Sequence, residues 1–151
     1  MEWMLMPLRR YAEFSGRSRR KEYWMFSLFL VIVVAILGAL MTAGGLPAMM
    51  EARSTGVALP PPGPLFFLGA GLLAVFLLAI IVPSIAVTVR RFHDRDMSGW
   101  WYLGFIVLGM IPYVGFIASI ASLVIMCLPG TPGPNRFGAN PLDPASAEVF
   151  A

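Results

Sequence analysis

Residues 23–44 read YWMFSLFLVIVVAILGALMTAG and contain no Asp, Glu, Lys or Arg. An α-helix of this length, at ~1.5 Å per residue, extends ~33 Å and matches the ~30 Å hydrocarbon core of a bilayer. The run is also longer than the ~7–15 apolar residues of a cleaved signal peptide. It therefore predicts a retained membrane span at 23–44.

Two further parts of the chain, residues 56–89 and 97–135, are equally free of charged side chains. Over all 151 residues the composition is 58% hydrophobic and only 13% charged, and a soluble domain of this length could not bury so many apolar side chains. The composition therefore predicts an all-α, polytopic membrane protein that forms a single membrane domain over residues 1–151.

Basic residues gather before the first span, and this determines the expected orientation. Residues 1–22 contain Arg9, Arg10, Arg17, Arg19, Arg20 and Lys21. The positive-inside rule places such a cluster in the cytoplasm, so 1–22 is predicted to be a cytoplasmic and interfacial segment. Because topology explains the charge, no nucleic-acid partner is expected.

Turn residues and charges divide the middle of the chain. Residues 45–64 are rich in Gly and Pro and predict an irregular external loop, after which the apolar residues 65–89 predict a second span. Arg90 and Arg91 follow directly, so residues 90–99 are predicted to be a cytoplasmic loop.

The last apolar stretch is too long for one span and too short for two. Pro112 and Gly115 interrupt it, which favours a helical segment at 100–110, a tight turn and a returning segment at 112–128. With the tail 129–151 also cytoplasmic, the chain is then a small bundle of four helical segments. The alternative has three spans, the last kinked at Pro112.

Few residues suggest a reaction. A catalytic zinc normally needs three protein ligands, whereas this chain has one His and one Cys. No nucleophile elbow and no phosphate-binding glycine loop occurs in the sequence. We therefore expect no enzymatic activity, no catalytic or metal-binding residues and no cofactor.

The densest polar stretch is RRFHDRDMSGWW at 90–101. Guanidinium groups suit bidentate contact with phosphate, which makes this stretch a candidate site for an anion or a lipid headgroup. The competing interpretation is that its arginines only obey the positive-inside rule. In that case Asp94 pairs with an arginine of the N-terminal segment, and Arg17 and Arg20 are the expected partners.

At three places the sequence resembles the domain of unknown function 805 family, the YhaH-like proteins of the bacterial inner membrane. These are SGRSRRKEYW at 15–24 (the N-terminal block), RRFHDRDMSGWW at 90–101 (the middle block) and CLPGTPGPNRFGANP at 127–141 (the tail block). The resemblance covers nearly the whole chain and implies a small multi-pass inner-membrane protein without established catalytic residues. The long Pro-rich external loop is a departure from the expected pattern.

In the four-segment topology all three blocks lie on the cytoplasmic side and predict a joint surface. By the resemblance, its candidate residues for anion, lipid or partner contact are Arg17, Arg20, Glu22, Arg91, His93, Asp94, Trp100, Asn135 and Arg136. We expect a non-enzymatic module that assembles through this face, as a homo-oligomer or in a larger membrane complex. The alternative is a binder or transporter of lipid headgroups or anionic solutes that uses the Arg-rich loops, with anionic membrane lipids as partners.

Overall fold

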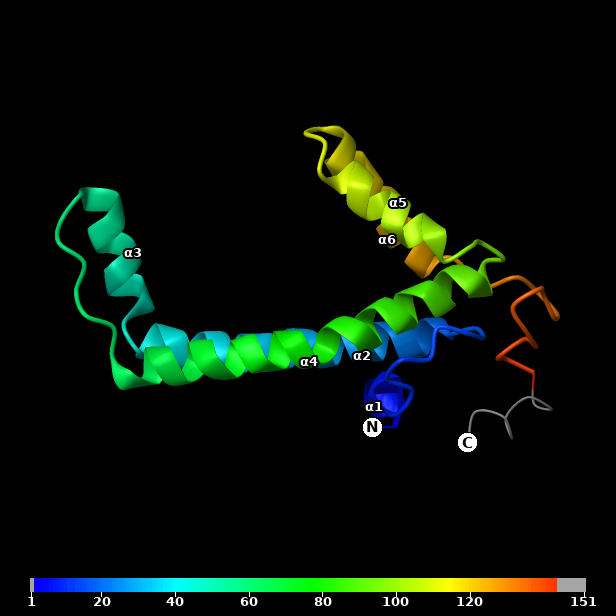
Figure 1. Cartoon of the computed structure of the whole chain (residues 1–151), viewed down its shortest axis with the longest axis horizontal. Coiled ribbons are helices and arrows are strands. Elements are labelled where there is room, and N and C mark those ends of the chain that lie inside the picture. The colour runs from blue at the N-terminus through cyan, green and yellow to red at the C-terminus, as the bar shows by residue number, and fades with distance from the viewer. Residues whose placement is uncertain (1, 144–151) are drawn as a thin grey trace. The chain divides into compact units, whose positions relative to one another are not determined.

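The computed structural model describes residues 2–143, and all regular structure in this part of the chain is helical. The helices are α1 (Glu2–Arg9), α2 (Arg20–Ala43), α3 (Leu46–Thr55), α4 (Pro64–Asp94), α5 (Trp100–Gly109) and α6 (Val114–Cys127) (Figure 1). The prediction of an all-α chain is confirmed. The residues group into two compact units: a first unit, which runs up to Ser27 and resumes at Val82, and a second unit, Leu28–Ile81. The prediction of a single membrane domain stays a prediction.

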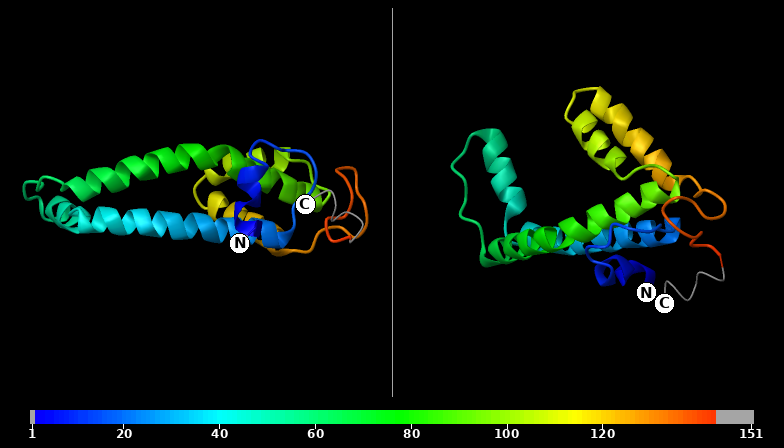
Figure 2. Two further views of the ribbon diagram at one scale, coloured as in Figure 1. Left: turned by 90° about the horizontal axis from the view of Figure 1, so that it is seen from below. Right: turned by 45° about the vertical axis from the view of Figure 1, so that its right-hand side comes forward.

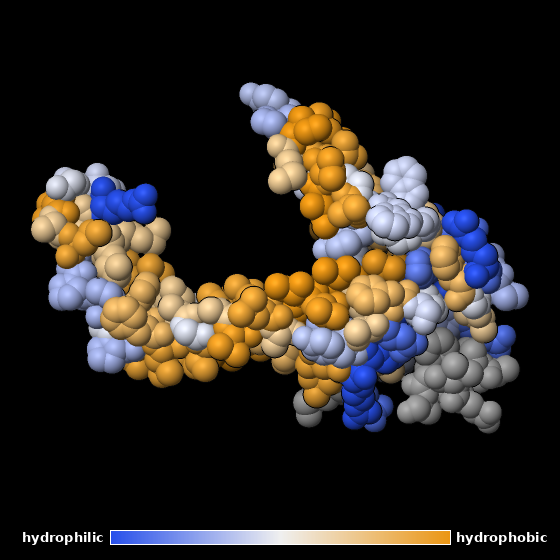
Figure 3. Space-filling model, in the orientation of Figure 1, coloured by the Kyte–Doolittle hydropathy of each residue, from blue (hydrophilic) through white to orange (hydrophobic). Residues whose placement is uncertain are grey.

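Helices α2 and α4 are long and apolar enough to cross a membrane. Their 24 and 31 residues give lengths of ~36 and ~46 Å at ~1.5 Å per residue. Only 11% and 6% of their most apolar windows are buried, which is typical of helices that face lipid and not of core helices in a soluble fold. Apolar residues cover α4 and the later helices on the face drawn in Figure 3.

Helix α4 continues through Asp94, so the prediction of a loop at 90–99 is wrong over its first half. The helix ends in a Schellman motif, in which the backbone N–H of Met97 donates to the carbonyl of Phe92 at 3.0 Å. Asp96 occupies the left-handed position with φ +57°, where glycine is the usual residue. Because no glycine marks this helix end, the sequence did not reveal it.

The predicted irregular loop at 45–64 contains α3, so that prediction is wrong for Leu46–Thr55. Pro47 suits the first turn of this helix, and Gly56 ends it with φ +71°. Within the second unit, the N–H of Gly63 donates to the carbonyl of Gly44 at 2.9 Å, which closes the connection between α2 and α4.

Helices α5 and α6 form an antiparallel hairpin within the first unit (Figure 2). Gly115 lies so close to the backbone of Gly109 that any Cβ at position 115 would collide with it. The four predicted helical segments are therefore present, and the alternative of one span kinked at Pro112 is wrong. At ~1.5 Å per residue, the 10 and 14 residues of the hairpin helices extend ~15 and ~21 Å, short of a ~30 Å membrane core.

Candidate functional site

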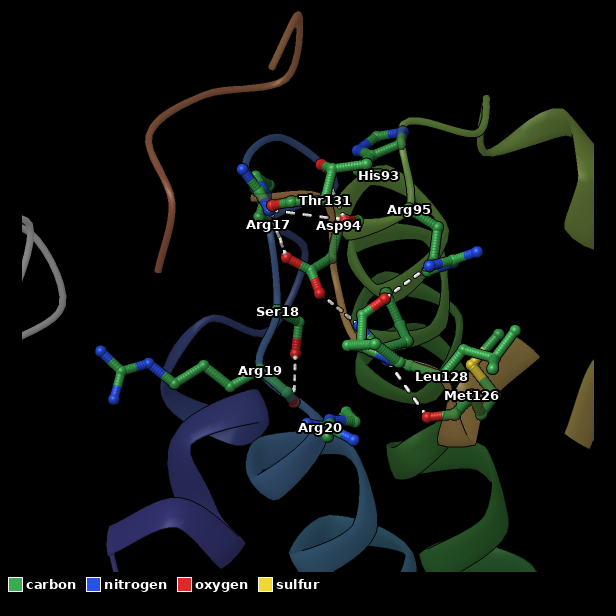
Figure 4. Close-up of polar contacts among 12 residues, drawn as sticks. Arg17, Ser18, Arg19, Arg20, His93, Asp94, Arg95, Met126, Leu128 and Thr131 are labelled. Atoms are coloured by element: carbon green, nitrogen blue, oxygen red, sulfur yellow. Dashed lines mark hydrogen bonds and ion pairs between the residues drawn. The ribbon is translucent and has the colours of Figure 1, made fainter. Parts of the chain in front are cut away.

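Asp94, in the last turn of α4, holds two arginines at once. Its Oδ1 accepts a hydrogen bond from Nε of Arg17 at 2.9 Å, and its Oδ2 accepts one from Nη1 of Arg91 (Figure 4). All three residues are buried, with exposed fractions of 4%, 1% and 0% respectively. The predicted ion pair between Asp94 and an N-terminal arginine is confirmed, with Arg17 as the partner.

Most of the other hydrogen bonds of the two guanidiniums reach the tail block or Met126, the residue before it. Arg17 donates to the carbonyls of Thr131 and Gly133, each at 2.7 Å. Arg91 donates to the carbonyl of Met126 at 3.3 Å and to that of Leu128. Every nitrogen of both side chains therefore donates a hydrogen bond. We call Asp94, Arg17, Arg91 and the carbonyls that they bind the Asp94 network. It connects the N-terminal, middle and tail blocks.

The backbone of Asp94 also binds the tail block. The N–H of Thr131 donates to the carbonyl of Asp94 at 2.8 Å. A Cβ placed on Gly130 would overlap the Asp94 carboxylate, so only glycine allows the tail to approach this closely. The carboxylate and carbonyl of one residue therefore determine the path of the tail block.

His93 connects the same three blocks on a neighbouring side of the helix end. Its Nδ1 lies 3.2 Å from the carbonyl of Gly16, which assigns the proton of the neutral ring to Nδ1. The ring stacks on Phe137 with centroids 3.9 Å apart and planes 3° from parallel. Asn135 donates to the carbonyl of His93 at 2.8 Å. His93 and Asn135 thus act in packing and positioning the tail.

A second buried ion pair joins Glu22 of α2 to Arg90 of α4, with a nitrogen–oxygen distance of 3.0 Å. The hydroxyl of Ser18 donates to Glu22 at 2.8 Å, and the N–H of Ser18 donates to the carbonyl of Arg90 at 3.2 Å. Glu22 was among the candidate residues, but Arg90 was missed. No sequence pattern indicated it, because it depends on α4 continuing as a helix through Arg90 and Arg91. Consecutive side chains of a helix point ~100° apart and so toward different partners.

A third pair lies in the connection between α1 and α2. Arg10 donates from Nε to Glu13 at 2.6 Å. This hydrogen bond lowers the pKa of the Glu13 carboxyl below its ordinary value, and the positive charge of Arg10 adds to the effect. The contact keeps Glu13 ionised but leaves it largely at the surface.

The remaining predicted residues lie outside the buried network. Arg20 is exposed and donates to the carbonyl of Cys127 at 3.2 Å. Arg136 pairs with Asp96 at 3.2 Å on the surface, and Trp100 is 78% exposed. The structure therefore divides the candidate set into a buried structural group and a few exposed residues. The arginines predicted to bind an anion through the middle block are already bonded to protein groups.

Within the described part of the chain, the titratable side chains do not form a recognisable metal centre. Between residues 2 and 143, no three His, Cys, Asp or Glu side chains lie close enough together to hold an ion. Around Asp94, one carboxylate binds two guanidiniums, and both of its oxygens already accept hydrogen bonds from them, which suits a structural role for this residue.

Comparison with known proteins identifies relatives that are named membrane proteins. A family model described as "Protein of unknown function (DUF805)" matches residues 11–139. The inner membrane protein YhaH of Escherichia coli (strain K12) is 38% identical over 142 residues, covering 93% of this chain and 97% of its own length. The inner membrane protein YhaI of the same organism is 39% identical over 141 residues, covering 93% and 96%. No solved structure matches the chain. The chain therefore belongs to the DUF805 family, which is described as being of unknown function, and its relatives YhaH and YhaI are named inner membrane proteins.

Proposed function

We propose that this protein is a non-enzymatic inner-membrane module that assembles with further copies of itself, and that its three motif blocks form a rigid cytoplasmic face. The observation that carries the proposal is the α5–α6 hairpin, which is apolar and too short to cross the membrane.

Both ends of the hairpin lie at the Asp94 network. Trp100 follows the end of α4 within a few residues, and Arg91 donates to the carbonyls of Met126 and Leu128 at the end of α6. The hairpin therefore starts and ends at one level. An uncharged hairpin held in this way enters the bilayer from one side and returns to it.

The turn of such a hairpin would lie within the hydrocarbon core. Met110 and Tyr113 in the turn are 81% and 90% exposed, and Phe116 just beyond it is 73% exposed. Backbone outside a helix is tolerated at this depth only where protein or a water-filled cavity covers it. A second copy of the chain is the simplest cover, and this supports self-assembly.

The topology proposed with it is multi-pass, with both chain ends in the cytoplasm. Bonds from Arg17 to Thr131 and Gly133 support this, because they hold the N-terminal and tail blocks on the same side. The excess of Arg and Lys in the N-terminal block makes that side the cytoplasm.

The absence of enzymatic activity is also a proposal. It is supported by the bonding of Asp94, Arg17 and Arg91 to one another, since a general acid or base must be able to reach a substrate. A catalysed reaction that is abolished by Asp94→Asn in a still-folded protein would contradict it.

Native mass spectrometry of the protein in detergent or nanodiscs tests the assembly, and we expect dimers or larger oligomers.

A cross-linking experiment then tests whether the hairpin is the surface used for assembly. In a Cys127→Ser background, Tyr113→Cys should form a disulfide between copies when a membrane-permeant oxidant is added. Leu78→Cys is the control, because Leu78 is 70% exposed on α4 and lies outside the hairpin. A monomer with no cross-link at either position would refute self-assembly.

A further inference from the structure

A cavity of about 440 Å³ lies between the first turn of α2 and the tail block. Arg19, Arg20 and Lys21 form the basic part of its lining, and the tail lines it with residues 129–132 and 140–142. Asp94 also reaches this cavity, but its two carboxylate oxygens already accept bonds from Arg17 and Arg91. The charge presented to a ligand is therefore positive.

The basic side chains of this lining retain donors for an anion. Arg20 donates to the carbonyl of Cys127 at 3.2 Å, whereas a guanidinium carries five N–H groups. The guanidinium of Arg19 and the ammonium of Lys21 lie 5.3 and 5.5 Å from the ring centroid of Trp3. A cation held over an aromatic face keeps its outward N–H groups available.

A second cavity of about 390 Å³ adjoins the first, because both are lined by Arg20 and Lys21. Its other lining residues are Trp24, Met25 and Cys127. Trp24 and Met25 lie one turn further into the span formed by α2, at the depth where a tryptophan marks the membrane interface. The basic cavity and a shallow, mainly apolar groove beside Trp24 and Met25 therefore meet at Arg20 and Lys21.

We propose that the two cavities together bind one anionic phospholipid, with its phosphate against Arg19, Arg20 and Lys21 and an acyl chain along Trp24 and Met25. Arginine and lysine supply charge-assisted hydrogen bonds to phosphate oxygens. A free phosphate ion would fill only the basic cavity and leave the groove bare, so the continuous shape favours a lipid. The site uses none of the buried guanidiniums of the Asp94 network and does not depend on the number of copies that assemble.

Lipid retention measures this directly. The protein is reconstituted in vesicles of phosphatidylcholine mixed with phosphatidylglycerol, extracted, and analysed by native mass spectrometry for bound phosphatidylglycerol. Arg20→Gln and Lys21→Gln, made singly so that most of the topology-determining charge remains, should each weaken retention about fivefold, the effect of one basic residue at a lipid surface. Arg9→Gln is the matched control, because it removes an exposed charge from the same segment but lines neither cavity.

The outcomes separate the possible ligands. Retention that falls equally with Arg9→Gln would show diffuse attraction to the surface and overturn the site. A soluble probe supplies the second arm: inorganic phosphate should displace no more phosphatidylglycerol than sodium chloride of the same ionic strength does. Displacement by phosphate alone would mean that the basic cavity takes the free ion, and the lipid assignment would fail. Melting temperatures of all variants in detergent establish that each is folded, so that a loss of lipid reports the site and not unfolding.

Discussion

Asp94 is the residue on which the joining of the three blocks depends most. Replacing it by Asn keeps the shape but leaves the buried guanidiniums of Arg17 and Arg91 without a counter-charge. Breaking a buried pair in this way costs about 3–5 kcal/mol. We expect Asp94→Asn to lower the melting temperature in detergent strongly at fixed salt.

Asp96→Asn is the matched control for this measurement. It removes the same charge from the same helix end, but its partner Arg136 is 60% exposed, and surface pairs contribute only about 0–1 kcal/mol. A double-mutant cycle of Asp94→Asn with Arg17→Gln should give a combined loss smaller than the sum. Additive losses, or equal effects of Asp94→Asn and Asp96→Asn, would mean that the network does not stabilise the fold.

The prediction for Gly130 concerns steric overlap and not charge. Gly130→Ala should destabilise the protein by about 1–3 kcal/mol, because its Cβ would overlap the Asp94 carboxylate and push the tail away. The comparison variant is Gly104→Ala, where a Cβ on α5 meets nothing within 4 Å. Its melting temperature should stay the same or rise, since alanine favours the helix. Equal melting temperatures for both variants would show that the tail does not approach Asp94 as described.

Of the two buried ion pairs that join α4 to the N-terminal block, one was predictable from the sequence and the other was not. That Asp94 meets Arg17 was predictable, because both lie next to spans that the positive-inside rule places with these ends on the same side. That Arg90 pairs with Glu22 was not, because it requires α4 to continue past the apolar run. The positive-inside rule counts Arg90 and Arg91 alike. On a helix, however, the two side chains point in different directions and therefore meet different partners.

Among the elements, the α5–α6 hairpin determines the side on which the chain ends. In the proposed topology neither helix crosses the bilayer, so a fluorescent reporter fused to the C-terminus should be active in the cytoplasm, and an alkaline phosphatase fused there should be inactive. A phosphatase inserted after Ser54, in the connection between α2 and α4, is the positive control. Phosphatase activity at the C-terminus would require the last helices to cross the membrane and would contradict the hairpin.

Helix α3 was not expected, but the helices on either side of it, α2 and α4, are connected independently of it. Gly44 and Gly63 meet through a 2.9 Å backbone hydrogen bond, so the path between α2 and α4 closes without α3. Replacing residues 54–59 by a short Gly/Ser link should leave membrane insertion and melting temperature unchanged. Gly44→Ala, by contrast, should destabilise the protein, because its Cβ would meet the backbone of Phe66. Loss of insertion on shortening would assign α3 a role of its own.

For the molecule as a whole, the two kinds of charge should respond differently to salt. Buried pairs are screened little, so the melting temperature in neutral detergent should change only slightly as ionic strength rises. Retention of phosphatidylglycerol should fall over the same range, because the proposed site is open to solvent at Arg20 and Lys21. Parallel losses of stability and lipid would show that the Asp94 network is exposed.

By itself, the amino-acid sequence determined the membrane class and the four apolar helical segments, and it predicts that the basic N-terminal block lies in the cytoplasm. These follow from local properties, namely the length of uncharged runs, the positions of Pro and Gly, and the distribution of Arg and Lys. Only the tertiary structure decided that α4 extends to Asp94, that 45–64 contains α3, and that Arg17 and Arg91 are buried donors to the tail. The burial of these two arginines depends on residues far apart in the chain, because an arginine can be buried only where distant carbonyls and a carboxylate meet its guanidinium.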